Sequence, residues 1–433
     1  MKHIISVLAL LVLVTGAYGT TYYVSTSGSD SNPGTQAQPW ATLQKAVDTI
    51  ANGDTILVMP GTYVGCRIRY GGASGAPKTL AAQTAGTVLV NAPGALCRRP
   101  SDIEVISDDF GSTPTPYWTI EGLEVALAPK WGIDGILANN LTIRNCVAHN
   151  NGQAANCTGL FSAYGNGVLI ENSTSYSNAE HGIYVNNSAD NGVLRRNVCY
   201  SNGGLGVHMN GDKSMGGDGI MSNWLVEKNI CYNNGSNGFD GDGVNYTLWR
   251  NNLAYDNVSK GIHLCAVNGA TNPAYDKVYN NTLISQVGAY YPLTFYKGSG
   301  KIKLGGNNNS VMNNILYHYE ITNNMRGSIM YVSSWMSTFQ SNYNVVVDRF
   351  AVDDNKTKYT LAQWRSTWGK DMNSTLCLDA SLIFIDDVNH NFHLKSTSPA
   401  INAGTTLADV TDDIEGEARP QGGGYDCGCY EDF

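Results

Sequence analysis

The sequence predicts an all-β solenoid in which short parallel strands stack coil upon coil. Three observations predict it: a glycine register, a tyrosine register that agrees with it, and a composition rich in turn formers. The glycine register consists of His181-Gly-Ile-Tyr-Val-Asn186, Leu205-Gly-Val-His-Met-Asn210, Asn237-Gly-Phe-Asp-Gly-Asp242 and Lys260-Gly-Ile-His-Leu-Cys265. The offsets between its glycines are 206−182=24, 238−206=32 and 261−238=23, as expected for one unit repeated with loops of variable length.

The tyrosine register has the same three offsets. It consists of Tyr176, Tyr200, Tyr232 and Tyr255, each followed by a polar residue and then by Asn. A related series of asparagines is Asn197, Asn229, Asn252, Asn281 and Asn314. We interpret this series as a ladder at a turn, where each short amide bonds to its copy in the next coil; the alternative is a set of solvent-exposed turn residues.

Alternation of side chains along each strand assigns the glycine-register residues to two faces. Two rows are expected inside: Ile183, Val207, Phe239, Ile262 and Val185, Met209, Gly241, Leu264. Two rows are expected outside: Tyr184, His208, Asp240, His263 and Asn186, Asn210, Asp242, Cys265. Because neighbouring strands lie about 4.8 Å apart, the outward rows should form a compact polar surface.

Composition and charge limit the function. The 48 glycines and the 15% of charged residues suit strands joined by tight turns. The net charge of −9, with no basic run, argues against a nucleic-acid partner. An acidic polysaccharide remains possible as a partner, because a bound cation or a local Lys/Arg cluster can reverse the sign of the charge inside a groove.

The segment 1–19 predicts a secretory signal peptide, with Lys2, an apolar run at 4–14 and small residues before the expected cleavage at Gly19. That run is too short to cross a bilayer, and no other stretch is apolar for long enough. We therefore expect a secreted or cell-surface protein, with no membrane span and monomeric, in which the segment 20–433 forms one elongated domain.

Both ends of the solenoid have recognisable elements. A strand is expected at 21–24, a capping helix at 41–51 and a strand at 54–59, so the segment 20–65 forms the N-terminal cap and first coil. The main coils are expected at 116–345. A helix at 360–368 with Thr360 as its N-cap lies in an insertion at 346–376, and a tail at 377–433 packs on the solenoid. Trp364 and Trp368 share a face of that helix, which favours packing on the solenoid over stacking on a sugar.

Ten cysteines in an exported chain allow up to five disulfides. Cys199 and Cys231 occupy equivalent places on adjacent coils, so they are expected either to form a disulfide or to stack as buried thiols. Cys427 and Cys429 lack the spacing of a redox or zinc motif, and we interpret them as structural.

Two flanking stretches carry a family resemblance. They are Tyr22-Tyr-Val-Ser-Thr-Ser-Gly-Ser-Asp-Ser-Asn-Pro-Gly-Thr35 with Trp40-Ala-Thr-Leu-Gln44, and Phe392-His-Leu394 with Ser398-Pro-Ala-Ile-Asn-Ala-Gly404. Together with the lengths of the coils, they resemble the secreted bacterial right-handed parallel β-helix proteins of the pectate-lyase-like superfamily. The resemblance implies a right-handed parallel β-helix and leaves the reaction open.

The outward row supplies the candidate catalytic residues. His208 and His263 flank Asp240 on the coils before and after it, as expected for proton carriers beside a carboxylate. Tyr184 lies one coil further and offers a second proton. Lys260 and His181 begin their strands at the edge of the same surface. Structural histidines in a polar stack are the alternative.

Four carboxylates suggest a calcium site. Asp240 and Asp242 share one strand face, and Asp212 and Asp218 lie in the loop just upstream. Calcium takes several oxygen ligands, so these four residues are the candidate metal ligands. Asp in Asn-Gly-Asp and Gly-Asp-Gly sequences is also a frequent turn former, which is the alternative.

These residues suit β-elimination or C5-epimerisation of a uronic acid polymer, in which a base removes the C5 proton and an acid protonates the leaving oxygen. Among proteins of the resembled fold, lyases use a Lys or Arg base and epimerases a Tyr and His pair near an Asp. A glycoside hydrolase is the main alternative, because His181-Gly182 and Lys301-Ile-Lys303 resemble fragments of polygalacturonase motifs, although their order differs. A non-catalytic glycan-binding or surface protein is the third hypothesis.

Overall fold

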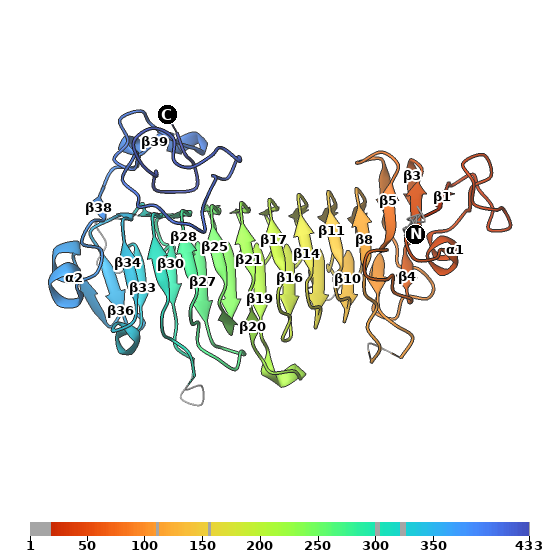
Figure 1. Cartoon of the computed structure of the whole chain (residues 1–433), viewed down its shortest axis with the longest axis horizontal. Helices are drawn as coiled ribbons and strands as arrows, with labels where there is room; N and C mark the ends of the chain where they lie inside the picture. The colour runs from red at the N-terminus through yellow and green to blue at the C-terminus, as the bar shows by residue number, and fades with distance from the viewer. Residues whose placement is uncertain (1–18, 110–111, 155–156, 299–303, 321–325, 433) are drawn as a thin grey trace, which may run out of the picture.

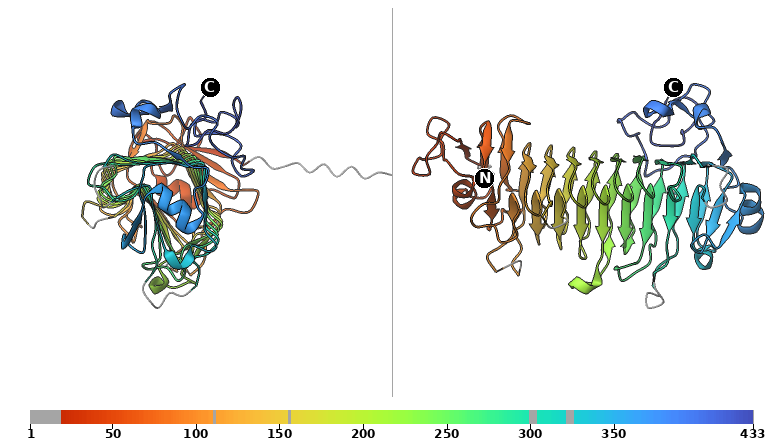
Figure 2. Two further views of the ribbon diagram at one scale, coloured as in Figure 1. Left: turned by 90° about the vertical axis from the view of Figure 1, so that its left-hand side faces the viewer. Right: turned by 180° about the vertical axis from the view of Figure 1, so that it is seen from behind.

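The computed structural model describes residues 19–109, 112–154, 157–298, 304–320 and 326–432. These residues wind into a long rod of stacked coils, with α1 (Leu43–Thr49) at one end and α2 (Leu361–Trp368) at the other (Figure 1). Seen along the rod, successive coils superimpose (Figure 2, left). The rod confirms the predicted parallel β-helix.

Three sheets of twelve strands each form the walls of the rod within the described residues. Sheet A contains β1 (Thr21–Val24), β2 (Thr55–Val58), β5 (Lys78–Ala82), β8 (Trp118–Glu121), β11 (Thr142–Arg144), β14 (Leu169–Glu171), β17 (Val193–Arg195), β21 (Leu225–Glu227), β25 (Leu248–Arg250), β28 (Lys277–Tyr279), β31 (Ser310–Met312) and β34 (Gln340–Asn342). Sheet B contains β3 (Gly61–Tyr63), β6 (Val88–Val90), β9 (Glu124–Ala126), β12 (Val147–His149), β15 (Thr174–Tyr176), β18 (Val198–Tyr200), β22 (Ile230–Tyr232), β26 (Leu253–Tyr255), β29 (Thr282–Ser285), β32 (Ile315–His318), β35 (Val345–Val346) and β38 (Thr375–Leu376). Sheet C contains β4 (Cys66–Ile68), β7 (Ile103–Val105), β10 (Ile133–Ile136), β13 (Leu160–Ala163), β16 (Ile183–Asn186), β19 (Val207–Asn210), β23 (Phe239–Asp242), β27 (Ile262–Cys265), β30 (Leu293–Phe295), β33 (Ile329–Tyr331), β36 (Phe350–Val352) and the antiparallel edge strand β37 (Thr357–Tyr359).

The predicted register of sheet C is confirmed at every position of the four glycine-register segments. Ile183, Val207, Phe239 and Ile262 are successive Cα partners on β16, β19, β23 and β27. All four side chains are fully buried in the core of the rod. The residues between them therefore point to the outer face of sheet C, which is the face that carries the candidate site.

The asparagine ladder is confirmed at the turn from sheet A to sheet B. Each ladder amide is buried, and its side-chain oxygen accepts hydrogen bonds from the preceding copy, as Asn229 does from the backbone and side-chain nitrogens of Asn197 (3.0 Å each). The ladder continues to Asn344. The alternative of exposed turn residues is wrong, because these amides are fully buried. The left-handed conformation belongs to the residue before each ladder amide, such as Lys228 (φ 57°).

A second asparagine ladder follows the tyrosine register in the sequence. Asn151, Asn178, Asn202, Asn234 and Asn257 bond to one another in the same way at the turn after sheet B. On the outer face of sheet B, the rings of His149 and the four tyrosines stack with centroids 4.8–5.0 Å apart. Stacking of like residues thus holds two corners and one wall of the rod in phase.

Helices cap both ends of the core. Thr42 caps α1, which buries Leu43, Ala46 and Val47 and is shorter than the predicted 41–51. Thr360 caps α2 with Gln363 in a capping box, as predicted. Trp364 is buried and stacks on Phe350 at 4.9 Å, which confirms packing over sugar binding.

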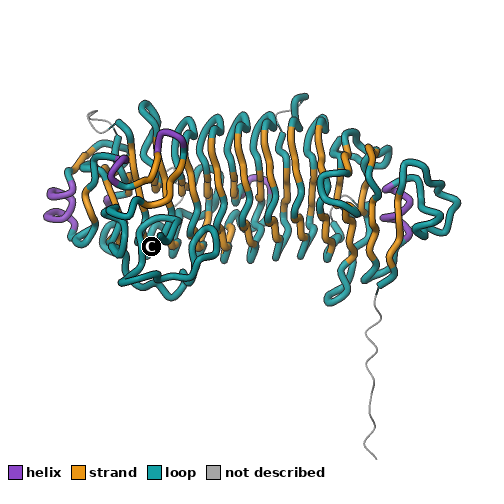
Figure 3. The backbone as a smooth tube through the Cα atoms, turned by 90° about the horizontal axis from the view of Figure 1, so that it is seen from above, coloured by secondary structure: helices purple, strands orange, loops and turns teal. Residues whose placement is uncertain are grey.

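The C-terminal tail lies on one side of the rod (Figure 3). It contains the hairpin of β39 (Phe384–Asp386) and β40 (Asn391–Leu394), and Phe384 and Phe392 pack with Ile315 and Val345 of sheet B. A further two-stranded sheet joins β20 (Met221–Ser222) to β24 (Val244–Asn245). The tail therefore covers sheet B and leaves the candidate site on sheet C open.

All ten cysteines lie in the described residues and are free thiols. Cys199 and Cys231 are Cα partners with fully buried side chains, so they stack as thiols and the expected disulfide is not formed. Cys427 and Cys429 are buried in the tail.

Two of the sequence features fall beyond what the structure describes. The expected signal peptide lies outside the described residues, apart from Gly19, and so does Lys301-Ile-Lys303. In the part of the chain that the structure describes, we find no helix with the length and hydrophobicity needed to span a bilayer.

Candidate functional site

The predicted outward row exists on sheet C. Tyr184, His208, Asp240 and His263 are successive Cα partners on β16, β19, β23 and β27. The second outward row aligns Asn186, Asn210, Asp242 and Cys265 in the same way. Side chains that are far apart in the sequence thus share one surface.

Three hollows follow this surface along the rod. The central one, about 360 Å³, is lined by His181, His208, Asp240, His263 and Cys265, among others. Toward the N-terminus lies an aromatic hollow of about 590 Å³ that includes Tyr184, and toward the C-terminus one of about 290 Å³ that includes Lys260 and His263. Because neighbouring hollows share or adjoin residues of one row, they suit a linear chain laid along the sheet.

His181 and His208 form a hydrogen-bonded pair whose protons can be assigned. Nδ1 of His181 accepts the backbone N–H of Leu205 (3.0 Å), so the proton of a neutral His181 lies on Nε2. This Nε2–H donates to Nδ1 of His208 (3.2 Å), and a neutral His208 therefore carries its own proton on Nε2. His208 thus presents an N–H donor to the central hollow.

Burial keeps both histidines neutral. It lowers the pKa of His181 to about 4. Burial also lowers the pKa of His208 well below its ordinary value, with a further contribution from His181. A neutral donor held by a second neutral imidazole can donate a hydrogen bond to an oxygen without carrying a net charge into the site.

Tyr184 is fixed beside this pair. Its ring stacks on His208 at 4.5 Å, and its hydroxyl accepts a hydrogen bond from Nδ2 of Asn210 (3.2 Å). Burial raises the pKa of Tyr184 above its ordinary value, so the phenol keeps its proton at neutral pH. Tyr184 is therefore a second proton donor on the N-terminal side of Asp240.

Asp240 lies at the centre of the row. Its Oδ2 accepts from Nδ2 of Asn237 (2.7 Å), and its Oδ1 lies 3.7 Å from Sγ of Cys265. Burial raises the pKa of Asp240 to about 7, and Asp242 adds to the rise. Asp240 is thus held between its two protonation states near neutral pH.

Lys260 lies on the C-terminal side of Asp240. Its Nζ is 3.4 Å from Oγ of Ser259 and 5.3 Å from the ring centre of Tyr290. Burial lowers the pKa of Lys260, although Asp240 opposes this shift. A half-buried amine with a lowered pKa has a larger neutral fraction at a given pH, as a general base requires.

Three of the four predicted calcium ligands accept hydrogen bonds from loop residues. Asp242 accepts the backbone N–H groups of Val267, Asn268 and Gly269 at 2.8–2.9 Å. Asp212 accepts from the backbone and hydroxyl of Ser214, and Asp218 accepts from Ile220 N–H. Each of these three carboxylates thus organises its own loop, and the four-carboxylate calcium site stays a prediction.

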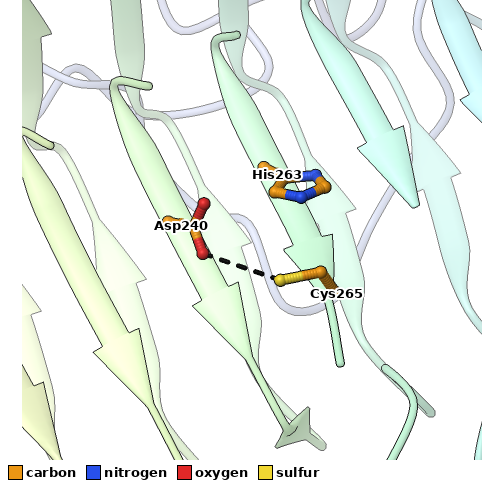
Figure 4. A group of neighbouring side chains, drawn as sticks. All are labelled: Asp240, His263 and Cys265. Atoms are coloured by element: carbon orange, nitrogen blue, oxygen red, sulfur yellow. Dashed lines mark hydrogen bonds between the residues drawn. The ribbon is translucent and has the colours of Figure 1, made fainter. Parts of the chain in front are cut away.

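Asp240 converges with His263 and Cys265 (Figure 4). One possible ligand atom from each lies within 4.8 Å of the others. Nδ1 of His263 bonds to Oγ1 of Thr294 (2.6 Å), and burial lowers the pKa of His263 to about 3. The sequence pattern placed Cys265 only in the second outward row, and its part in this group emerges from the structure.

The row is longer than the glycine register indicated. Phe161 precedes Tyr184 and Thr294 follows His263 as Cα partners. Gly159 before Leu160-Phe161 offered the same signal, one coil before Gly182, and was missed. Thr294 offered no such signal, because Pro292 stands where the earlier coils have Gly.

A positively charged side chain, Arg99, also lines the aromatic hollow. The guanidinium carbon of Arg99 lies 4.0 Å from the ring centre of Trp131 and 5.2 Å from that of Phe161. Its Nε pairs with the fully buried Asp134 at 2.9 Å. Aromatic rings with a fixed guanidinium suit an acidic sugar, which offers apolar ring faces and a carboxylate.

Comparisons with known proteins agree with this architecture. Residues 22–163 match the family model "Pel9A-like, right handed beta helix region", and residues 118–223 match "Right handed beta helix region". The structure of pectate lyase Pel9A superimposes with a TM-score of 0.62 and 20% identity over 96% of both chains. The chain is a right-handed β-helix with the Pel9A-like pectate lyase fold. This confirms the resemblance found in the sequence.

Other similarities reach proteins with different names. The complex of XylC with xylose superimposes with a TM-score of 0.58 and 12% identity, over 96% of this chain and 98% of XylC. Mannuronan C5-epimerase AlgE3 of Azotobacter vinelandii is 39% identical over 90 residues, which are 21% of this chain. The match spans 5% of the length of that epimerase. The similarity to mannuronan C5-epimerases is therefore distant and local.

Proposed function

We propose that this protein is a secreted enzyme that removes the C5 proton of a uronic acid in a polysaccharide, as a lyase or a C5-epimerase. The observation that carries the proposal is that Lys260, a half-buried amine with a lowered pKa, interacts with the charge of Asp240 from the coil after it, while the neutral donor His208 is the Cα partner of Asp240 on the coil before it. Lys260 lies just before β27 and lines the C-terminal hollow, whereas His208 on β19 lines the central hollow, and His263 lines both. A sugar chain laid along these two hollows meets both the base and the donor.

Lys260 is the base in this mechanism. Its neutral amine takes the C5 proton, and the electron pair of the broken C–H bond enters the sugar as a carboxylate-stabilised carbanion. The proton rests on Lys260 as an ammonium ion. The neighbouring carboxylate of Asp240 stabilises that ammonium ion through its charge.

His208 and Tyr184 are the donors. In β-elimination the carbanion pair forms the C4–C5 double bond, the C4–O bond breaks, and the leaving oxygen takes a proton from the Tyr184 hydroxyl while His208 Nε2–H donates a hydrogen bond to it. In epimerisation no C–O bond breaks, and a donor returns a proton to the opposite face of C5. His181 positions His208 through their hydrogen bond.

The similarities support a uronic acid substrate. Pectate lyase and mannuronan C5-epimerase are the names of two matched proteins. Arg99 and the rings around it offer a subsite for an acidic sugar in the adjoining hollow. The hydrolase alternative needs two available carboxylates, whereas Asp242 is committed to three backbone N–H groups.

The test is to incubate the purified mature protein with pectate, alginate and a neutral glycan. A lyase generates unsaturated, ultraviolet-absorbing chain ends on one of the two acidic polymers. An epimerase leaves chain length unchanged and alters the C5 configuration, which nuclear magnetic resonance detects. New reducing ends without ultraviolet absorbance would favour a hydrolase, and binding without any product would favour a glycan-binding protein; either result would overturn the proposal.

A further inference from the structure

The group Asp240, His263 and Cys265 has a donor set that calcium does not use. One oxygen, one imidazole nitrogen and one sulfur are available within 4.8 Å of one another. Calcium selects oxygen ligands, whereas thiolate and imidazole together select zinc and its neighbours in the transition series. We propose that Asp240, His263 and Cys265 form a binding site for one transition-metal ion of the zinc class.

The spacing of the donors suits tetrahedral coordination. With bond lengths of about 2.3 Å to sulfur and about 2.0 Å to oxygen, a tetrahedral zinc ion places these two ligands about 3.5 Å apart. Sγ of Cys265 and Oδ1 of Asp240 lie 3.7 Å apart. The two atoms therefore already stand at the distance that a shared zinc ion requires.

Outer partners hold two of the ligands in orientation. Asn237 donates to Oδ2 of Asp240, which leaves Oδ1 for the metal. The buried Thr294 bonds to Nδ1 of His263, which leaves Nε2 as the second ring nitrogen. Metal-binding histidines and carboxylates in proteins are held by partners of this kind.

The strands explain how the group forms. His263 and Cys265 are two residues apart on β27 and so share its outer face, and Asp240 is the Cα partner of His263 on β23. The three ligands line the central hollow, so a fourth position is open to water or to a substrate oxygen.

The position of the ion gives it a role that rests on the proposed function. An ion at this point lies in the hollow that His208 also lines and can bind the carboxylate of the uronic acid whose C5 proton is removed. Metal binding itself does not depend on that reaction and can be measured without substrate.

The experiment uses the mature protein after exhaustive chelation. It is titrated with Co²⁺ and with Zn²⁺ while binding heat and near-ultraviolet absorption are recorded, and Ca²⁺ is tested as a competitor. We expect one Co²⁺ per chain with a thiolate-to-cobalt charge-transfer band, displacement by Zn²⁺ and no displacement by Ca²⁺. Absence of stoichiometric binding, absence of the band, or displacement by equimolar Ca²⁺ would overturn the site, whatever the result with polysaccharides.

Variants locate the metal. Cys265→Ser should remove the charge-transfer band, whereas Cys377→Ser, which changes a thiol bonded to a backbone carbonyl near the tail, should leave it unchanged. Thr294→Val should lower cobalt affinity by about 10-fold or more, because His263 loses its outer partner. Retention of the band in a folded Cys265→Ser protein would contradict the assignment; the titration of the unaltered protein decides the matter if that variant does not fold.

Discussion

Two polar rows of this solenoid share one repeat and behave differently. The ladder that contains Asn197, Asn229 and Asn252 repeats one residue, is fully buried, and bonds each amide to the next copy. The row of Tyr184, His208, Asp240 and His263 changes residue at every coil. Like residues in register form hydrogen bonds with one another. Unlike residues leave donors, acceptors and titratable groups with shifted pKa values on the surface of the hollows.

Buried polar atoms without a partner show the same contrast. Asn186 Oδ1 and Asn237 Oδ1, both next to the site row, are buried and have no hydrogen-bond partner in the described structure, whereas the amide oxygens of the ladder from Asn229 to Asn344 are bonded. An unpaired buried polar group costs about 1–3 kcal/mol. The site row therefore contributes less to stability than the ladder does, and we expect mutations to separate the two rows.

The largest effect is expected at the base. Lys260→Met keeps the length of the side chain and removes the amine, and we expect kcat/KM on the active polyuronate to fall at least 1,000-fold, or about 4 kcal/mol of transition-state stabilisation. The midpoint of thermal unfolding should stay within about 2 °C, because no core contact is removed. Full activity of Lys260→Met would contradict the role of Lys260 as the base.

A substitution in the asparagine ladder should lower stability and leave activity unchanged. Asn229→Ala removes the oxygen that two groups of Asn197 share and the donor that reaches Leu194 and Asn252. We expect the free energy of unfolding to fall by about 3 kcal/mol, measured by denaturant titration, with turnover per folded molecule unchanged. Asn166→Ala, at an exposed corner, is the control and should cost less than about 0.5 kcal/mol.

A smaller effect is expected at His181, which acts through His208. His181→Phe keeps a ring and removes the Nε2–H donor to His208. We expect kcat to fall about 10- to 50-fold with KM nearly unchanged, since orientation of a donor is lost and binding surface is kept. A change in KM together with a lower unfolding midpoint, with kcat retained, would assign His181 a structural role.

The pH profile should show the smallest effect and sharpens the assignment of roles. Because Lys260 reacts as a neutral amine, kcat/KM should rise with pH and level off at its pKa, which burial lowers below the ordinary value of about 10.4. His181, with a pKa of about 4, is already neutral and contributes no inflection near pH 6.5, whereas Asp240, with a pKa of about 7, should contribute one as its carboxylate forms. Activity that falls as pH rises from 6 to 9 would contradict a lysine base.

The sequence was sufficient for the geometry of the repeat and insufficient for its chemistry. Equal spacing of glycines and tyrosines placed Tyr184, His208, Asp240 and His263 in one row, because a strand has only two faces and the coils are in phase. Loop conformation could not be predicted from the sequence in this way. Asp242 holds the backbone of residues 267–269, a contact that depends on where three N–H groups point.

The groups that orient the site histidines also could not be predicted from the sequence. That Leu205 N–H fixes the proton of His181, and that Thr294 fixes the ring of His263, depends on side-chain positions across neighbouring coils. The helix at α2 was predictable because Thr360 and Gln363 act locally, within one turn of one another.

The most direct test of the central claim follows hydrogen at C5. Pectate and alginate are incubated in D₂O with the unaltered protein and with Lys260→Met, and the deuterium content and configuration at C5, together with unsaturated ends, are measured by nuclear magnetic resonance. We predict that the unaltered protein gives C5 deuterium with inversion, or unsaturated ends, on one polymer, and that Lys260→Met gives neither. Chain cleavage by the unaltered protein with C5 hydrogen and configuration retained would contradict proton abstraction by this row.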